Sequence, residues 1–150
     1  MTHSTFIMLK PDAKDNNLEQ TILKELEEKG CIIKRQARVL VDKELILTHY
    51  KEVIEQVDIK DFPHRILKEY EHKEVLIAEV VHPQQEVVSF VREMIGATEP
   101  IKANAHTIRG KYSNDSYAKS MAEERLVRNL IHASDSIETA QKEIQLWFKD

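Results

Sequence analysis

A histidine near the end of the chain is the residue best placed to do chemistry. His132 lies between the apolar pair Leu130-Ile131 and the segment Ser134-Asp135-Ser136, so we expect it where a short buried strand gives way to a helix. A neutral imidazole can attack phosphorus or accept a proton near pH 7 without further activation. A lone histidine in a polar loop usually has no such role, so the rest of the chain must decide its function.

A carboxylate partner for His132 is available on the last predicted helix. Glu143 lies at the flank of the apolar face of this helix, where it is either a solvated carboxylate or a group that orients His132. Asp135 stands three residues before Glu138 and is expected to cap the helix as part of a capping box. The residues expected on the buried face are Ile137, Ala140, Ile144 and Trp147.

Cations, hydroxyl groups and an amide elsewhere in the chain complete an inventory for phosphoryl transfer. That reaction needs donors that neutralise phosphate oxygens and an acceptor in line with the leaving group. Some of the candidate residues also have an ordinary structural explanation: Lys10 as a solvated lysine at a strand end, Tyr50 as a core residue, and Arg92 as part of a solvated helix face. The candidates are the cations Lys10, Arg92 and Arg109, the hydroxyls of Tyr50, Thr98 and Ser134, and the amide of Asn129.

Side chains rather than a glycine-rich loop must hold the phosphates. The three glycines of the chain form neither of the two common glycine-rich phosphate-binding patterns. No acidic cluster is suited to direct metal ligation, so any Mg²⁺ is expected to be held by phosphate oxygens and water.

The elements that position these residues follow from the apolar patterns. Strands are expected at residues 5–10, 31–41 and 74–81 and just before His132. Helices are expected at 16–29, 43–57, 84–95 and 136–147. Asp15 or Asn16 is expected to cap the helix at 16–29, and Asp42 the helix at 43–57. Phe62-Pro63 is expected to interrupt a polar connector, and 97–112 to be a long irregular stretch of the kind that carries function. This order predicts an α+β fold of the ferredoxin-like split βαβ type, a four-stranded antiparallel sheet with helices packed on one face.

Length and composition predict a single domain over residues 1–150. With 41% hydrophobic and 32% charged residues the chain can form an ordinary globular core. The net charge of −4 gives no electrostatic basis for binding nucleic acid or a membrane. Cys31 is the single cysteine, which excludes an intramolecular disulfide, and the apolar run at residues 6–9 is too short for a signal peptide or membrane span. We therefore expect a cytoplasmic protein.

Five blocks of sequence stand in order along nearly the whole chain. They are TFIMLKPD at 5–12, GATEP at 96–100, TIRG at 107–110, NLIHASDS at 129–136 and EIQLWF at 143–148. Together these blocks resemble nucleoside diphosphate kinases. The resemblance implies a ping-pong exchange, in which His132 takes the γ-phosphate of a nucleoside triphosphate and the phosphohistidine passes it to a diphosphate. Glu143 would fix the imidazole tautomer, and Ser134 would assist near that carboxylate or the transferred group.

The resemblance also assigns the nucleotide contacts and the partners. Asn129 matches the residue that contacts the sugar hydroxyl. In the family the first of two consecutive phenylalanines stacks on the base; Asp61 stands at that position here, so Phe62 or another residue would have to take over the stacking. The resemblance further implies Mg²⁺, nucleoside tri- and diphosphates, and a homo-oligomer built from dimers, with a hexamer as the usual size. The residues that match phosphate-binding positions are Lys10, Tyr50, Arg92, Thr98 and Arg109.

The chain departs from the family pattern around the base and the oligomer contacts. Asp61-Phe62-Pro63 replaces two consecutive phenylalanines, and Asn104-Ala105-His106 stands where Pro-Gly is usual. The segment from Ser113 to Arg125 is an insertion expected close to the base.

Two other classes of function fit the sequence less well. A non-enzymatic nucleotide-binding or assembly module on the same fold would need neither His132 nor Glu143. An RNA-binding sheet would need exposed aromatic residues, yet the predicted strands offer only Phe6. The sequence therefore favours the kinase.

Overall fold

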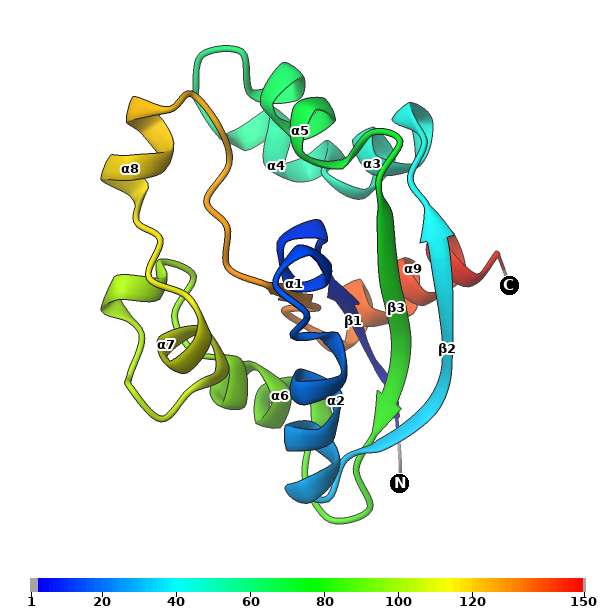
Figure 1. Cartoon of the computed structure of the whole chain (residues 1–150). Helices are drawn as coiled ribbons and strands as arrows, with labels where there is room; N and C mark the ends of the chain where they lie inside the picture. Colours follow the sequence, from blue (N-terminus) through cyan, green and yellow to red (C-terminus); the bar gives the residue numbers. More distant parts are fainter. Residues whose placement is uncertain (1–2, 150) are drawn as a thin grey trace.

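One antiparallel sheet of four strands forms the centre of the molecule. In the computed structural model, which describes residues 3–149, the strand order is β2-β3-β1-β4 (Figure 1). The strands are β1 (Thr5–Leu9), β2 (Ile32–Leu40), β3 (Glu74–Val81) and β4 (Ile131–Ala133). The predicted ferredoxin-like α+β class and the antiparallel sheet are confirmed.

Helices cover both faces of this sheet, so the prediction of helices on one face was wrong. Phe6 and Met8 of β1 point to one face, and Ile7 and Leu9 point to the other. The Ile7 face packs against α2 (Glu19–Glu28) and α6 (Val87–Ile95), and the Phe6 face against α3 (Lys43–His49), α5 (Phe62–Tyr70) and α9 (Ile137–Phe148). A strand that is apolar at four consecutive positions, Phe6 to Leu9, has two faces to bury, which is why β1 lies inside the sheet.

The early helices differ from the prediction at their ends. A short helix, α1 (Pro11–Asp15), directly follows β1, and α2 begins after Leu18 without a side-chain cap, so neither Asp15 nor Asn16 caps it. Gly30 ends this region with φ of 97°, a conformation that glycine adopts without steric cost.

The second predicted helix divides in two at Tyr50. Asp42 caps α3 by accepting a hydrogen bond from the Leu45 N–H at 2.8 Å, as predicted, and α4 (Lys51–Gln56) follows after Tyr50. Phe62-Pro63 starts α5 rather than interrupting a connector, because proline in the first turn lacks only an N–H that has no intrahelical partner.

The stretch 97–112 is less irregular than predicted, because it contains a 3₁₀ turn, η1 (Pro100–Lys102), and the helix α7 (Ile108–Tyr112). A further helix, α8 (Tyr117–Ala122), lies in the segment from Ser113 to Arg125. Thr107 and Ser116 cap these two helices through their hydroxyl oxygens, which gives each short helix a defined start.

Two predictions about the start of α9 were wrong. Ser136, not Asp135, is the N-cap, because its hydroxyl oxygen accepts the Thr139 N–H at 3.0 Å. Ile137 is 42% exposed in the first turn, whereas Ala140, Ile144 and Trp147 are buried as expected. Within residues 3–149, no helix has both the length and the apolar character that crossing a bilayer requires.

Candidate active site

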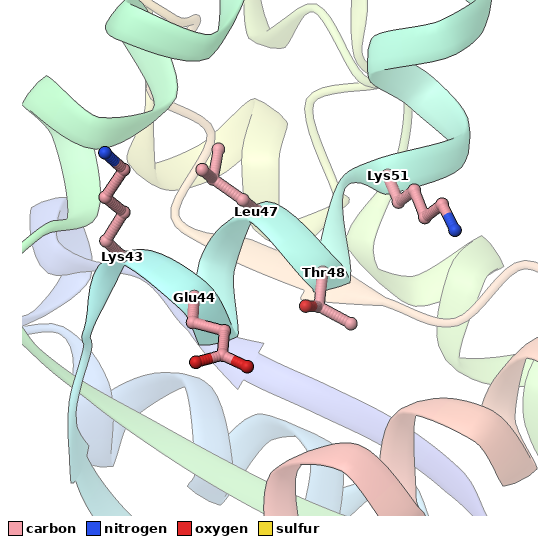
Figure 2. Close-up of a pocket in the computed structure, with 5 residues that line it drawn as sticks. All are labelled: Lys43, Glu44, Leu47, Thr48 and Lys51. Atoms are coloured by element: carbon pink, nitrogen blue, oxygen red, sulfur yellow. The ribbon is translucent and has the colours of Figure 1, made fainter.

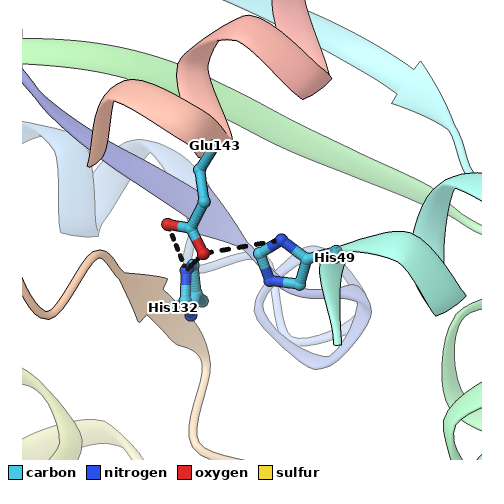
Figure 3. A group of neighbouring side chains, drawn as sticks. All are labelled: His49, His132 and Glu143. Carbon is cyan, nitrogen blue, oxygen red and sulfur yellow. Dashed lines mark hydrogen bonds and ion pairs between the residues drawn. The ribbon is translucent and has the colours of Figure 1, made fainter. Parts of the chain in front are cut away.

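His132 and Glu143 face each other between β4 and α9. His132 is the middle residue of β4, opposite Met8 of β1, rather than at a strand–helix junction. Its Nε2 lies 3.0 Å from Oε1 and 3.1 Å from Oε2 of Glu143 (Figure 3). The Ser134 hydroxyl donates a hydrogen bond to Oε1 of the same carboxylate at 2.5 Å. The three residues predicted to form the reactive group are therefore in contact.

This carboxylate determines which imidazole nitrogen can react. A carboxylate only accepts hydrogen bonds, so His132 carries its proton on Nε2 and the lone pair on Nδ1. Burial would raise the pKa of Glu143, but the hydrogen bond and charge of His132, with His49 and Ser134, outweigh burial and lower it. The His132 side chain is 25% exposed, and no residue among 3–149 makes a hydrogen bond to Nδ1. The lone pair of Nδ1 thus has no hydrogen-bond donor among the described residues.

His49 is a fourth member of this group that the sequence analysis missed. Its ring lies edge-on to the His132 ring with 4.7 Å between centroids, and its Nδ1 accepts a hydrogen bond from the Trp147 indole at 3.0 Å. Burial, followed by the charge of His132, lowers the pKa of His49 to about 3. The signal that could have found it is spacing, because His49 follows the buried Ile46 by three residues on the same helical face.

The backbone before His132 is fixed by residues from β1 and α1. The Lys10 N–H donates to the Leu130 carbonyl at 2.8 Å, and Oδ2 of Asp12 accepts the Leu130 N–H at 3.0 Å. Leu130 has a φ of 75°, a conformation that costs a bulky residue energy. The Asp12 carboxylate, which is buried, helps to hold this strained turn and so the position of β4.

Lys10, Asn129 and Thr98 form a continuous polar chain beside this turn. The Lys10 ammonium donates to Oδ1 of Asn129 at 2.9 Å, and Nδ2 of Asn129 donates to the Thr98 carbonyl at 3.0 Å. Burial lowers the pKa of Lys10, as does the charge of Arg109, whereas Asp12 opposes the shift. The site therefore holds a largely desolvated cation, which binds an anion more strongly than an exposed lysine does.

Arg109 and Arg92 add two further cations next to β4. Arg109 is buried and donates to the backbone carbonyls of Asn129 at 3.2 Å, Gly96 at 3.1 Å and Ile131 at 2.6 Å. Arg92 is exposed on α6 and donates to the Ala133 carbonyl at 3.0 Å. Burial lowers the pKa of Arg109 to about 10, with the charge of Arg92 as the second cause. Two cations close enough to repel each other favour an anionic ligand between them.

Tyr50 and Phe62 belong to the packed side of the site. The Tyr50 hydroxyl lies 2.9 Å from the Tyr70 hydroxyl, and burial raises the pKa of Tyr50 to about 12. Phe62 is 7% exposed and packs in the same core cluster as Tyr70. Both are close to the groups described above, but neither touches His132 through a hydrogen bond.

The His132 group has the spacing but not the chemistry of a magnesium site. One ligand atom each from His49, His132 and Glu143 lies within 4.8 Å of the others. Mg²⁺ prefers oxygen ligands in an octahedron, whereas two of these three ligands are imidazoles, and Trp147 already uses the His49 Nδ1 lone pair. These residues fit the orientation of His132 better than the binding of Mg²⁺.

A separate hollow lies on the outer side of α3 and the start of α4. It is lined by Lys43, Glu44, Leu47, Thr48 and Lys51 (Figure 2). All of these except Leu47 are exposed, so the hollow is open to solvent, and we assign it no function.

Comparisons with known proteins agree on one family. The family model "Nucleoside diphosphate kinase" matches residues 3–150. The nucleoside diphosphate kinase of Methanobrevibacter smithii is 35% identical over all of this chain and 89% of its own length. The Streptococcus pneumoniae enzyme is 35% identical over 96% of this chain and 98% of its own length.

Solved structures give the same result. A nucleoside-diphosphate kinase from Borrelia burgdorferi, a transition-state mimic with bound vanadate and ADP, superposes with a TM-score of 0.92 at 28% identity. The match covers 99% of this chain and 88% of that one. An NDP kinase from Pyrobaculum aerophilum has a TM-score of 0.84 at 28% identity, over 99% of this chain and 96% of that one.

Proposed function

The chain belongs to the nucleoside diphosphate kinase family, and from this premise we propose that His132 carries the phosphoryl group in its reaction. The reaction is transfer of the γ-phosphate of a nucleoside triphosphate to a nucleoside diphosphate. A non-enzymatic nucleotide-binding module is not favoured, because the relatives are named as kinases. The observation that supports His132 is its contact with Glu143, which leaves Nδ1 unprotonated and open to a ligand.

In the first half-reaction, Nδ1 of His132 attacks the γ-phosphorus. The Nδ1–P bond forms as the bond from phosphorus to the β,γ-bridging oxygen breaks, and the diphosphate leaves with that electron pair. The imidazole gains positive charge, which the Glu143 carboxylate 3.0 Å from Nε2 stabilises. Ser134 acts as a positioning residue, since its hydroxyl is fully buried and bonded to Glu143. In the second half-reaction the terminal oxygen of a diphosphate attacks the phosphohistidine, and the Nδ1–P bond breaks.

Lys10, Arg92 and Arg109 would neutralise the phosphate oxygens during both steps. All three lie around the backbone from Asn129 to Ala133, so their charges converge on the strand that carries His132. Thr98 and Tyr50 would add hydroxyl donors. Positioning and charge stabilisation account for most of the catalysis in phosphoryl transfer.

Asn129 has hydrogen-bonding capacity left for the sugar, and Phe62 provides the ring for the base. An asparagine amide has two donors and two lone pairs. The contacts to Lys10 and Thr98 use one of each, which leaves one N–H and one lone pair for a sugar hydroxyl. Phe62 would contact the base through the part of its ring that is not covered by the core.

Mg²⁺ would enter with the nucleotide. The side chains around the phosphate site are cationic, so phosphate oxygens and water are the natural ligands of the ion. When bound, Mg²⁺ neutralises charge on those oxygens. Removing Mg²⁺ with a chelator should therefore stop turnover while leaving the fold, measured by circular dichroism, unchanged.

We also propose that the chain forms a homo-oligomer built from dimers, with a hexamer as the expected size. β2 is an edge strand of the sheet and exposes Ile32 and Leu40, which are 51% and 63% accessible. An unpaired edge with exposed apolar residues is a ready surface for a second copy. Light scattering after size exclusion tests this, and a monomer at micromolar concentration would refute it. The cytoplasmic location remains a prediction from sequence, which cell fractionation can test.

The mass of the intact protein after brief incubation with Mg-ATP tests the role of His132. We expect an adduct of one phosphoryl group that is acid-labile, that a GDP chase removes, and that is absent in His132→Ala. His72→Asn is a matched control, because His72 is exposed and has a φ of 65° that asparagine tolerates. An adduct that persists in His132→Ala, or GTP formation by that variant, would refute the assignment.

A further inference from the structure

His49, the last residue of α3, uses only one of its two ring nitrogens within the protein. Its Nδ1 accepts the hydrogen bond from the Trp147 indole at 3.0 Å. The Glu143 carboxylate lies 3.6 Å from the same nitrogen, which is beyond hydrogen-bond distance. No other hydrogen bond to this ring is formed within residues 3–149, so Nε2 has no partner there.

The unused nitrogen of His49 is the one that carries the proton. An indole N–H only donates, so Nδ1 offers its lone pair to Trp147, and the single proton of a neutral imidazole lies on Nε2. Burial, with the charge of His132, lowers the pKa of His49 to about 3, so the ring is neutral near pH 7. Nε2–H is therefore a hydrogen-bond donor that lacks an acceptor in the described part of the chain.

This donor belongs to the small exposed part of the His49 side chain. The side chain is 2% exposed, and Nε2 is not among the fully buried polar atoms that lack a partner, so part of the exposed area is at Nε2. His132, whose ring is in contact with it, is 25% exposed. Both imidazoles therefore reach the surface of the site.

The two imidazoles direct their remaining nitrogens to one side. The rings are nearly perpendicular, with 81° between their planes and 4.7 Å between their centroids. Figure 3 shows the second nitrogen of each ring on the side away from the Glu143 carboxylate. These nitrogens are Nδ1 of His132, which has the lone pair, and Nε2 of His49, which has the proton. A donor thus lies beside the nitrogen that we propose as the carrier of the phosphoryl group.

Aromatic contacts fix this arrangement. The Phe6 ring lies 6.0 Å from the His132 ring and 5.9 Å from the Trp147 ring, centroid to centroid, and the Trp147 ring is 5.5 Å from that of His49. Phe6 and Trp147 are both buried. Because the four rings pack against one another, the Nε2–H donor is held in place before a ligand binds, and such preorganised donors are the ones that contribute most to catalysis.

We propose that His49 is a further catalytic residue, whose Nε2–H donates a hydrogen bond to an oxygen of the phosphoryl group while that group moves to and from His132. This inference rests on the proposed function, in which Nδ1 of His132 carries the phosphoryl group. Phosphoryl oxygens are charged acceptors, and a hydrogen bond to a charged group is roughly twice as strong as one between neutral groups. The cations around β4 supply charge, whereas His49 supplies a neutral donor with a fixed direction.

Two amide substitutions separate this donor from the structural contact with Trp147. The amide of asparagine stands as many bonds from Cα as Nδ1 of histidine, so His49→Asn keeps an acceptor for Trp147 and loses the donor at Nε2. The amide nitrogen of glutamine stands as many bonds from Cα as Nε2, so His49→Gln keeps that donor and loses the acceptor at Nδ1. His49→Phe keeps an aromatic ring and has neither group.

The experiment measures, by rapid quench, how fast Mg-ATP phosphorylates the enzyme and how fast GDP removes the phosphoryl group. Losing one hydrogen bond to a charged group slows a step by about 10- to 100-fold. We expect this loss in both steps for His49→Asn and His49→Phe, whereas His49→Gln should keep most of the wild-type rate. The control His72→Asn changes an exposed histidine and should match the wild type.

The opposite ranking of the two amide variants would overturn the proposal. If His49→Asn keeps the wild-type rate and His49→Gln does not, His49 acts through Trp147 and is only structural. Equal rates in all three variants, fast or slow, would show that the Nε2–H donor is not used.

NMR of the ¹⁵N-labelled wild type gives a readout that needs no variant. The Nε2–H proton of His49 should move to higher frequency when His132 is phosphorylated, and an unchanged signal would contradict the proposed contact. If the wild type forms no phosphate adduct, the proposed role of His132 fails and the role of His49 fails with it. If the adduct forms while the signal stays unchanged, only the role of His49 fails.

Discussion

The indole N–H of Trp147 donates a hydrogen bond to Nδ1 of His49 over 3.0 Å. Because Nδ1 accepts this bond, the proton of the neutral His49 ring lies on Nε2. Burial is the main reason that the pKa of His49 falls to about 3, and the neighbouring His132 contributes. His49 therefore remains uncharged next to His132 near neutral pH, and it places no positive charge against the nucleophile that we propose.

This arrangement predicts a specific dependence of stability on pH. An unfolded histidine has a pKa of about 6.5, so on acidification the unfolded chain binds a proton that His49 in the native state does not bind. The contribution of neutral His49 is complete above about pH 6.5 and is lost as the pH falls from there toward 3. His49→Gln should flatten the decline in unfolding free energy between pH 7 and pH 4, measured by urea denaturation. Parallel pH profiles for His49→Gln and the control His72→Asn would contradict this expectation.

Substitutions of Glu143 and Ser134 should slow phosphohistidine formation to different extents. Glu143→Gln keeps the shape of the side chain but removes the charge that faces Nε2 of His132. We expect phosphohistidine formation to slow by about 10- to 100-fold, the usual cost of losing a group that orients a reactive histidine. Ser134→Ala should have a smaller effect, because its buried hydroxyl touches the carboxylate and not the ligand. Rapid-quench measurements of adduct formation test both, and an equal loss in the two variants would give Ser134 a more direct role.

Substitutions of Arg109 and Arg92 should distinguish an effect on the stability of the fold from an effect on nucleotide binding. Arg109→Ala removes charge-assisted phosphate bonds of ~1.5–3 kcal/mol each, and it also leaves three backbone carbonyls without their donor. We therefore expect both weaker nucleotide binding and a loss of about 3 kcal/mol or more in unfolding free energy. Arg92→Ala should weaken binding with little change in stability, because Arg92 is exposed and bonds one carbonyl. Calorimetric binding and urea denaturation provide the two readouts, and unchanged stability of Arg109→Ala would contradict the first expectation.

Much of the sheet could be predicted from sequence because its signals are local. β3 matches the predicted strand at both ends, since an apolar run interrupted only by Glu79 is followed by His82-Pro83. The ends of α2 and α6 follow from Gly30 and Gly96, both of which have positive φ. The contact of Glu143 with His132 agrees with the orienting role that the resemblance implied, because helix spacing placed Glu143 beside the buried stripe.

The remaining features depend on tertiary contacts that no local pattern contains. Tyr50 bonds to Tyr70 from a different helix, and the break between α3 and α4 at this residue has no proline or glycine to mark it. Ser134 and Ser136 are similar residues in sequence, yet one bonds Glu143 and the other caps α9. Helix spacing could have placed His49 on the buried face of α3, but its hydrogen bond with Trp147, which is far away in the chain, could not be predicted.

A buried ion pair closes the insertion that is unusual in this chain. Arg125 binds both carboxylate oxygens of Asp115, and the Arg128 N–H donates to Oδ2 of Asp115 at 2.7 Å. Burial would raise the pKa of Asp115, but the bonds from Arg125 and Arg128 outweigh burial and lower it to about 2. Because Asn129 directly follows Arg128, this carboxylate connects the insertion to the nucleotide site.

Asp115→Asn should therefore weaken both the fold and nucleotide binding. Removing one member of a buried ion pair leaves the other charge unpaired, and we expect a loss of about 3 kcal/mol at pH 7. An aspartate pKa of about 2 lies below the unfolded value near 3.9, so its contribution is complete above about pH 4 and is lost as the pH falls through 2. The variant should lack this acid-dependent part of the stability curve. Glu123→Gln is the control, because Glu123 bonds the same arginine at 2.7 Å from an exposed position and should matter far less. If both variants behave alike in urea denaturation at pH 7 and pH 3, the pair does not stabilise the insertion.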